Sequence, residues 1–311
     1  MKFGLRHQLF VPPGWAGENP WEYTCRRALR AEADGFASFW LMDHFYNLPV
    51  HGKNAHDPFF DAWTALPALA AVTSRIRLGP LVTPVGYRNP ALLARMAASL
   101  DYLSDGRLYL GFGAGGYRPE YRAYGYDFPP HASVRIAQME EAVRLMKAMW
   151  TQPRATFHGE YFHVEEAILE PKPIQQPHPP VLIGGVGEKT LLRALARSGD
   201  ACNLFGPPAE FRRVRAVLRR HCEAEGRDEA EIEKTTFDVV LCARDERSLK
   251  AKMEPLGFVP EPWKALVGTP AQLADVVGQY AAEGAQHLLL EFHANDEESY
   301  GLFVEEVMGK S

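Results

Sequence analysis

An acid and an imidazole stand together at Asp43 and His44, directly after the apolar run 36–42. The run is short and follows Gly35, which favours a buried strand over a helix. In parallel α/β folds, the chemistry gathers at the carboxyl ends of the strands. An imidazole in such a place can exchange protons near neutral pH. From this pair alone, a histidine satisfied within the core is about as good an interpretation as a catalytic one.

A glycine run at 111–116, Gly-Phe-Gly-Ala-Gly-Gly, contains a formal G-x-G-x-x-G pattern after a predicted strand. A dinucleotide-binding turn needs a helix that opens within the glycines, whereas this run leads into a Tyr-Arg-Pro segment and follows three earlier strands. We therefore do not interpret it as a Rossmann turn. Glycines still let backbone amides approach an anion or a flat ring closely. Gly113, Ala114 and Gly115 are candidate cofactor contacts, and a tight structural turn is the alternative.

A second glycine run lies between a predicted strand and a predicted helix that begins near residue 189. Amides at a helix amino terminus, together with the helix dipole, form an anion site that glycines leave open. Two such runs after two strands predict one phosphorylated cofactor across the mouth of the fold. The glutamate that ends the run could contact a ligand or simply favour the dipole. The candidate residues are Gly184, Gly185, Val186, Gly187 and Glu188.

The stretch 78–90 is rich in proline and glycine and continues a predicted strand. A bulge or a cis peptide at Leu81, Val82 and Thr83 would present a ledge to a planar ring. The alternative is that the prolines only end the strand.

Short apolar runs alternate with segments of helical period almost to the end of the chain, as in repeated βα units. Eight strands separated by helices predict an α/β fold, a (β/α)8 TIM barrel, over 1–311 as a single domain. Insertions are expected at its carboxyl-terminal face, at about 114–135 and 155–180, the second including a small hairpin. The predicted strands are 3–9, 37–42, 76–82, 107–112, 181–183, 201–204, 236–242 and 287–291. The predicted helices are 23–33, 61–71, 90–102, 136–150, 189–198, 211–225, 246–254, 271–282 and 297–308.

Composition narrows the classes of function. A formal net charge of −5 without a dense basic block argues against nucleic-acid binding. No apolar run approaches the roughly 18 residues of a membrane span, and no leader-like segment begins the chain, so a cytoplasmic protein is expected. Four scattered cysteines suggest reduced thiols and offer no metal-binding pair; no metal site is predicted. A metal-free hydrolase would need two facing carboxylates, for which Asp43, Glu120 and Glu291 are available.

Several segments in order resemble the luciferase-like monooxygenase superfamily, and within it the oxidoreductases that depend on the deazaflavin coenzyme F420. The resemblance covers nearly the whole chain. The segments that carry it are 40–45 (Trp-Leu-Met-Asp-His-Phe), 73–79, 82–84, 88–90, 100–101, 104–107, 111–115, 120–121, 123–125, 171–173, 184–185 and 187–188.

The resemblance implies a barrel oxidoreductase that moves a hydride between F420 and a small organic substrate. The coenzyme ring would rest against the Leu81–Thr83 ledge, often a non-prolyl cis peptide in this family, and the glycine runs would hold its ribityl and phosphate part. His44 matches the base of alcohol- and sugar-phosphate-oxidising members, and Asp43 would orient the imidazole or touch the cofactor. The alternatives are FMN with an oxygen-using monooxygenase activity, or a non-catalytic flavin-binding protein. Dimers are common in the superfamily, so a homodimer is a further expectation.

Two positions depart from the branch that oxidises glucose 6-phosphate. That branch carries an acid just after the first glycine run and a tryptophan shortly after the Asp-His pair, where this chain has Gly116 and Leu48. We therefore do not expect glucose 6-phosphate to be the substrate.

Overall fold

The computed structural model describes residues 1–7, 19–48, 54–259, 261, 264 and 266–310. Within these ranges, one ten-stranded parallel sheet has the order β3-β2-β1-β12-β10-β9-β8-β5-β4, with β11 beside β10. Its strands are β1 (Lys2–His7), β2 (Ser38–Leu41), β3 (Arg77–Pro80), β4 (Thr83–Pro84), β5 (Leu110–Gly113), β8 (Val181–Gly184), β9 (Ala201–Phe205), β10 (Glu233–Cys242), β11 (Val267–Gly268) and β12 (His287–Phe292). Residues 8 and 9 of the first predicted strand lie outside the described ranges.

The sheet closes on itself between β3 and β5. Leu78 forms a parallel bridge with Leu108, just before β5, and β4 pairs with β5 after the chain passes a cis peptide between Leu81 and Val82. The strand expected over 76–82 is therefore two short strands that share one position in the barrel. With β11 at the periphery, eight strand positions remain, which confirms the predicted (β/α)8 barrel.

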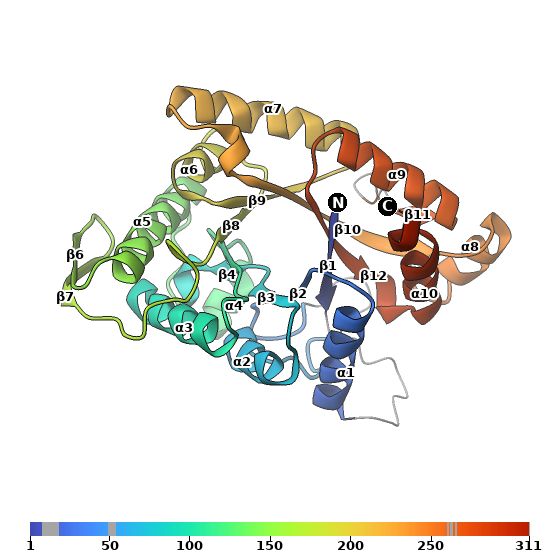
Figure 1. Cartoon of the computed structure of the whole chain (residues 1–311), viewed down its shortest axis with the longest axis horizontal. Coiled ribbons are helices and arrows are strands. Elements are labelled where there is room, and N and C mark those ends of the chain that lie inside the picture. Colours follow the sequence, from blue (N-terminus) through green and yellow to red (C-terminus); the bar gives the residue numbers. More distant parts are fainter. Residues whose placement is uncertain (8–18, 49–53, 260, 262–263, 265, 311) are drawn as a thin grey trace.

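Helices surround the strands on the outside of the barrel, except for α4, which lies nearer its centre in Figure 1. They are α1 (Pro20–Ala33), α2 (Ala62–Val72), α3 (Pro90–Leu103), α4 (Arg118–Ala123), α5 (Ala132–Thr151), α6 (Leu191–Ser198), α7 (Pro208–Ala224), α8 (Glu246–Met253), α9 (Pro270–Ala282) and α10 (Glu297–Glu306). Local chemistry marks where several of them begin. Asn89 accepts hydrogen bonds from the amides of Ala91 and Leu92 before α3, and Thr269 forms a capping box with Gln272 before α9.

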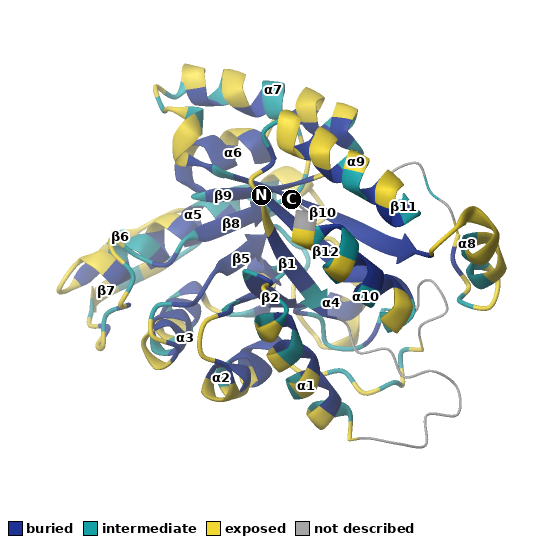
Figure 2. Ribbon diagram, turned by 45° about the vertical axis from the view of Figure 1, so that its right-hand side comes forward, coloured by how far each residue is buried: buried dark blue, intermediate teal, exposed yellow. Residues whose placement is uncertain are grey.

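Two apolar layers hold the barrel together. The larger packs the outer faces of the strands against the helices, whose outward faces stay exposed while the strands are buried (Figure 2). A smaller cluster includes Trp40, Tyr109, Phe237 and Leu289. Along the strands, its residues alternate with residues of the larger cluster. This alternation is how a barrel fills its interior with side chains.

Both predicted insertions contain ordered elements. The first leaves the carboxyl end of β5 and holds α4, a six-residue helix that the sequence patterns did not predict. Pro119 suits the first turn of that helix because it lacks an amide that would need a partner. The second holds an antiparallel hairpin of β6 (Ala155–His158) and β7 (His163–Ala167), as expected. It runs into the amino-terminal end of β8, where Gln175 bonds to Asp101 and Leu108 ahead of β5, so the expectation that this insertion lies at the carboxyl-terminal face is wrong. Glu141 of α5 accepts hydrogen bonds from amides at the tip of the hairpin.

Among the residues that the structure describes, no helix combines the length and the hydrophobicity that crossing a membrane requires.

Candidate active site

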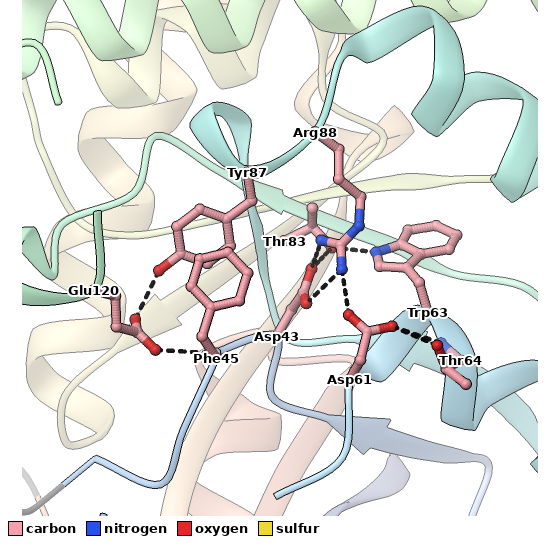
Figure 3. A network of polar contacts seen from close by, with 9 residues as sticks. All are labelled: Asp43, Phe45, Asp61, Trp63, Thr64, Thr83, Tyr87, Arg88 and Glu120. Carbon is pink, nitrogen blue, oxygen red and sulfur yellow. Dashed lines mark hydrogen bonds and ion pairs between the residues drawn. The ribbon is translucent and has the colours of Figure 1, made fainter. Parts of the chain in front are cut away.

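His44 lies three residues beyond the end of β2 and contacts an acid from the first insertion. Its Nδ1 donates to Oε2 of Glu120 at 2.6 Å. The same carboxylate accepts from the Phe45 amide at 2.7 Å and from the Tyr87 hydroxyl at 2.6 Å (Figure 3). Glu120 is 0% exposed. Three segments that are far apart in the sequence therefore meet at one buried carboxylate.

The electrostatics of Glu120 define which way this hydrogen bond runs. Burial works to raise the pKa of Glu120, but hydrogen bonds from His44 and Tyr87 outweigh it and hold the pKa below its ordinary value. An ionised carboxylate can only accept, so Nδ1 carries a proton, and in the neutral ring the lone pair is then on Nε2. The His44 side chain is 21% exposed, which keeps the ring within reach of a ligand at the barrel mouth.

Asp43 belongs to a different network. Its carboxylate accepts from the Thr83 hydroxyl at 2.7 Å and from two nitrogens of Arg88 at 2.6 and 3.2 Å. Trp63 donates in turn to Thr83, and Arg88 also reaches Asp61 (Figure 3). Burial raises the pKa of Asp43, and the Arg88 charge opposes that effect. Of the two roles expected for Asp43, orienting the imidazole belongs instead to Glu120, while contact with a cofactor stays a prediction.

The predicted ledge lies against both glycine runs. A Cβ atom built on Gly113 would lie 2.8 Å from a methyl group of Val82, and one built on Gly184 would lie 3.4 Å from its other methyl group. A side chain at residue 113 would therefore displace Val82, so glycine is what lets the ledge pack closely against the first run. The cis peptide that the resemblance implied is present at Leu81–Val82.

The second glycine run is open at the surface. Val186 and Gly187 are exposed, and Gly185 has a φ of +130°, where a side chain would be strained. Helix α6 begins at Leu191, two residues later than expected, so a turn separates the glycines from its first amides. The carboxylate of Glu188 pairs with Arg213 of α7.

Of the other residues predicted to contact the cofactor, some lie near the surface and one is buried in the core. Ala114 and Gly115 follow β5 and are partly exposed, whereas the Thr83 side chain is buried and its hydroxyl is engaged with Asp43. The sequence identifies His44 and Glu120 as separate candidates, but it does not predict that they pair. The signal available for it was the Glu-Tyr pair at 120–121, among the segments that carry the family resemblance.

The carboxylates considered for a hydrolase are each engaged. Asp43 pairs with Arg88, Glu120 holds His44, and Glu291 forms an ion pair with Arg6. A pair of facing acids that share a water is therefore not what these residues form. In the described part of the chain, no three His, Cys, Asp or Glu side chains gather as a metal site would require.

Comparison with known proteins adds three findings. A family model described as luciferase-like monooxygenase matches residues 1–311. A protein of Kineococcus radiotolerans named F420-dependent glucose-6-phosphate dehydrogenase is 33% identical over 297 residues, which cover 86% of this chain and 85% of that protein. Two solved structures share the fold over nearly their whole lengths.

The first is the coenzyme F420 dependent tetrahydromethanopterin reductase of Methanopyrus kandleri, with a TM-score of 0.80, 17% identity, and 99% of each chain covered. The second is a type II Baeyer-Villiger monooxygenase of Pseudomonas putida in complex with FMN, with a TM-score of 0.77, 18% identity, and 100% of this chain and 98% of that one covered. Since the family model spans the whole chain, as the motifs predicted, the chain belongs to the luciferase-like monooxygenase family.

Proposed function

We propose that this protein is an oxidoreductase that transfers a hydride between coenzyme F420 and a small organic substrate. The observation that carries the proposal is the His44 imidazole at the carboxyl end of β2, with Nδ1 held by a buried, ionised Glu120. The name of the Kineococcus radiotolerans relative supports F420 as the coenzyme. The packing of Val82 against Gly113 and Gly184 joins the ledge to both glycine runs, as expected if one flat ring and its polar chain are held there.

Oxidation of an alcohol carbon requires the hydroxyl proton to leave as the hydride departs. Bound F420 would supply the ring that accepts the hydride. Nε2 of His44 takes the hydroxyl proton, and Nδ1 remains bonded to Glu120, which stabilises the imidazolium. In the reverse direction, Nε2 returns the proton to a carbonyl oxygen.

Within this proposal, the other predicted contacts hold the coenzyme. Leu81 and Val82 would back the ring. The amides of Gly113, Ala114 and Gly115 on one side, and those of residues 184–188 on the other, would hold the ribityl and phosphate part. Asp43 would contact the ring edge from the Arg88 network.

The substrate is proposed to differ from that in the relative's name. Gly116 and Leu48 stand where the branch that oxidises glucose 6-phosphate carries an acid and a tryptophan. A Cβ on Gly116 would meet no atom within 4 Å, so a side chain would fit there and its absence is a difference in chemistry rather than in space.

A binding titration tests the coenzyme. Purified protein is titrated with F420, FMN and NADPH, each oxidised and reduced, and ligand or tryptophan fluorescence is followed. We expect F420 to bind most tightly. Binding of FMN alone would overturn the proposal in favour of the flavin monooxygenase alternative.

A substitution tests the base. We expect His44→Ala to keep F420 binding while turnover of a substrate found by screening small alcohols and carbonyls falls by about two or more orders of magnitude. His158→Ala is the matched control, because His158 is exposed on the β6–β7 hairpin. Unchanged turnover in His44→Ala would refute the assigned role.

A further inference from the structure

Tyr87 and His44 donate to the same oxygen of Glu120. The Tyr87 hydroxyl and the His44 Nδ1 each lie 2.6 Å from Oε2, while Oε1 accepts from the Phe45 amide. A carboxylate oxygen that accepts two hydrogen bonds shares its charge between them. The strength with which Glu120 attracts the proton of the imidazole therefore depends on what Tyr87 donates.

Packing fixes the direction of the Tyr87 hydroxyl. Tyr87 is buried at the end of the 3-10 turn η1 (Val85–Tyr87), which follows the ledge strand β4. Its ring stacks on Phe45, with centroids 4.3 Å apart and planes 28° apart (Figure 3). Burial, with the contact to Glu120, raises the pKa of Tyr87, so the phenol keeps its proton as a donor.

We propose that Tyr87 is a positioning residue for His44: by donating to Glu120 Oε2, it weakens the pull of that carboxylate on the imidazole and keeps Nε2 available as a base. The inference rests on the function proposed above and extends it from the base to the group that adjusts the base. In hydride transfer from an alcohol, a carboxylate that is too strong a partner would leave the imidazole protonated and unable to accept the hydroxyl proton.

Among the described residues, the other titratable groups near His44 have partners of their own. The Tyr117 ring meets the imidazole edge-on, with centroids 6.5 Å apart, and Tyr46 interacts with Tyr117 and Glu120. Asp43 is engaged with Arg88 and Thr83. Within the described ranges, Glu120 is thus the carboxylate that bonds to the ring, and Tyr87 acts on the ring through it.

A titration of the imidazole in the protein without coenzyme or substrate tests the inference. The ring nitrogens are followed by 15N NMR against pH, and the His44 signals are assigned with His44→Asn. We expect Tyr87→Phe to raise the titration midpoint of His44 by about 0.5–1 pH unit, because the carboxylate becomes a stronger partner. We expect Glu120→Gln to lower the midpoint by about 1–2 pH units, because the negative charge is lost.

The double variant Tyr87→Phe/Glu120→Gln separates tuning from packing. If Tyr87 acts through Glu120, the double variant titrates like Glu120→Gln alone. Tyr124→Phe is the matched control, since Tyr124 also stacks on Phe45 but donates to its backbone oxygen; its midpoint should equal that of the wild type. Circular dichroism and the dispersion of the amide spectrum establish that each variant is folded.

Equal midpoints in wild type and Tyr87→Phe would overturn the inference, as would a shift of the same size in the presence and absence of the Glu120 carboxylate. Neither result depends on the coenzyme, so the inference can fail while F420 binding and the role of His44 hold. Conversely, failure to bind F420 would overturn the proposed function and leave the NMR result standing. In turnover, the acidic limb of the pH profile should move with the NMR midpoint in each variant.

Discussion

Replacing Arg88 with methionine tests what keeps Asp43 charged inside the protein. Arg88 contacts the Asp43 carboxylate through both terminal nitrogens, and 1% of the Asp43 side chain is exposed. Methionine retains much of the apolar stem but removes the charge. The variant therefore leaves a buried carboxylate that keeps the Thr83 hydroxyl as a donor.

The size of the effect follows from burial. Removing one partner of a buried ion pair costs about 3–5 kcal/mol of unfolding free energy. The Arg88 side chain is 12% exposed, so water can reach part of the vacated space and the lower end of that range applies. Loss of the contact with the more exposed Asp61 adds about 0–1 kcal/mol. We expect Arg88→Met to lose about 3 kcal/mol at pH 7.

The loss of stability in Arg88→Met should depend on pH, and the direction follows from the pKa of Asp43. Burial raises the pKa of Asp43 and Arg88 opposes this, so the pKa rises further in Arg88→Met. The folded variant then binds a proton more readily than the unfolded chain, and its stability increases relative to wild type as the pH falls. Urea unfolding at pH 7 and pH 5 should therefore show a smaller loss at pH 5. Asp43→Asn/Arg88→Met should recover most of the loss, because no charge stays buried unpaired. Equal losses at both pH values, without recovery in the double variant, would trace the effect to packing and refute the reasoning.

Two further predictions concern the amino-terminal side of the barrel. Arg107 is buried and donates to the carbonyl oxygens of Ala70, Thr73, Ile76 and Ser104. Arg107→Met should therefore lower the free energy of unfolding in urea by about 3 kcal/mol or more. Its affinity for F420 should stay unchanged, because the amino-terminal end of β5 is remote from the site. For Glu32, burial acts to raise the pKa, but hydrogen bonds from the amides of residues 74–76 outweigh it and lower the pKa to about 2. The stability from Glu32 is thus present above the unfolded pKa, near 4.5, and is lost as pH falls toward 2. Glu32→Gln should be less stable than wild type at pH 7, with a gap that narrows in unfolding experiments at lower pH.

The barrel could be predicted from sequence because its signals are local. Buried parallel strands read as short apolar runs, and the helices between them carry their own period and caps, such as Asn89 before α3. For the strand over 76–82, the sequence offers a bulge, a cis peptide or a simple end of the strand, and does not decide among them. Helix α4 escaped prediction because six residues are too few to display a helical period.

The partner of His44 could not be predicted from the residues for a geometric reason. Asp43 is the candidate that adjacency in sequence suggests, yet adjacent side chains need not face the same partners. Asp43 turns to Thr83 and Arg88, while His44 turns to Glu120. Glu120 lies 76 positions further along the chain than His44. Its place beside His44 depends on how the first insertion packs against the segments that follow β2 and β4. No local pattern records that packing.

The pKa values of the two buried acids, Asp43 and Glu120, shift in opposite directions, and this difference bears on where a proton can be exchanged at the site. Burial dominates at Asp43 and raises its pKa, whereas donated hydrogen bonds dominate at Glu120 and lower its pKa. Arg88 is a permanent cation, so the charge of its pair with Asp43 is fixed. The partner of Glu120 is an imidazole, whose charge can change near neutral pH. In the proposed function, Asp43 would thus serve as a fixed polar support, and His44 would exchange a proton at Nε2 while Nδ1 stays bonded to Glu120.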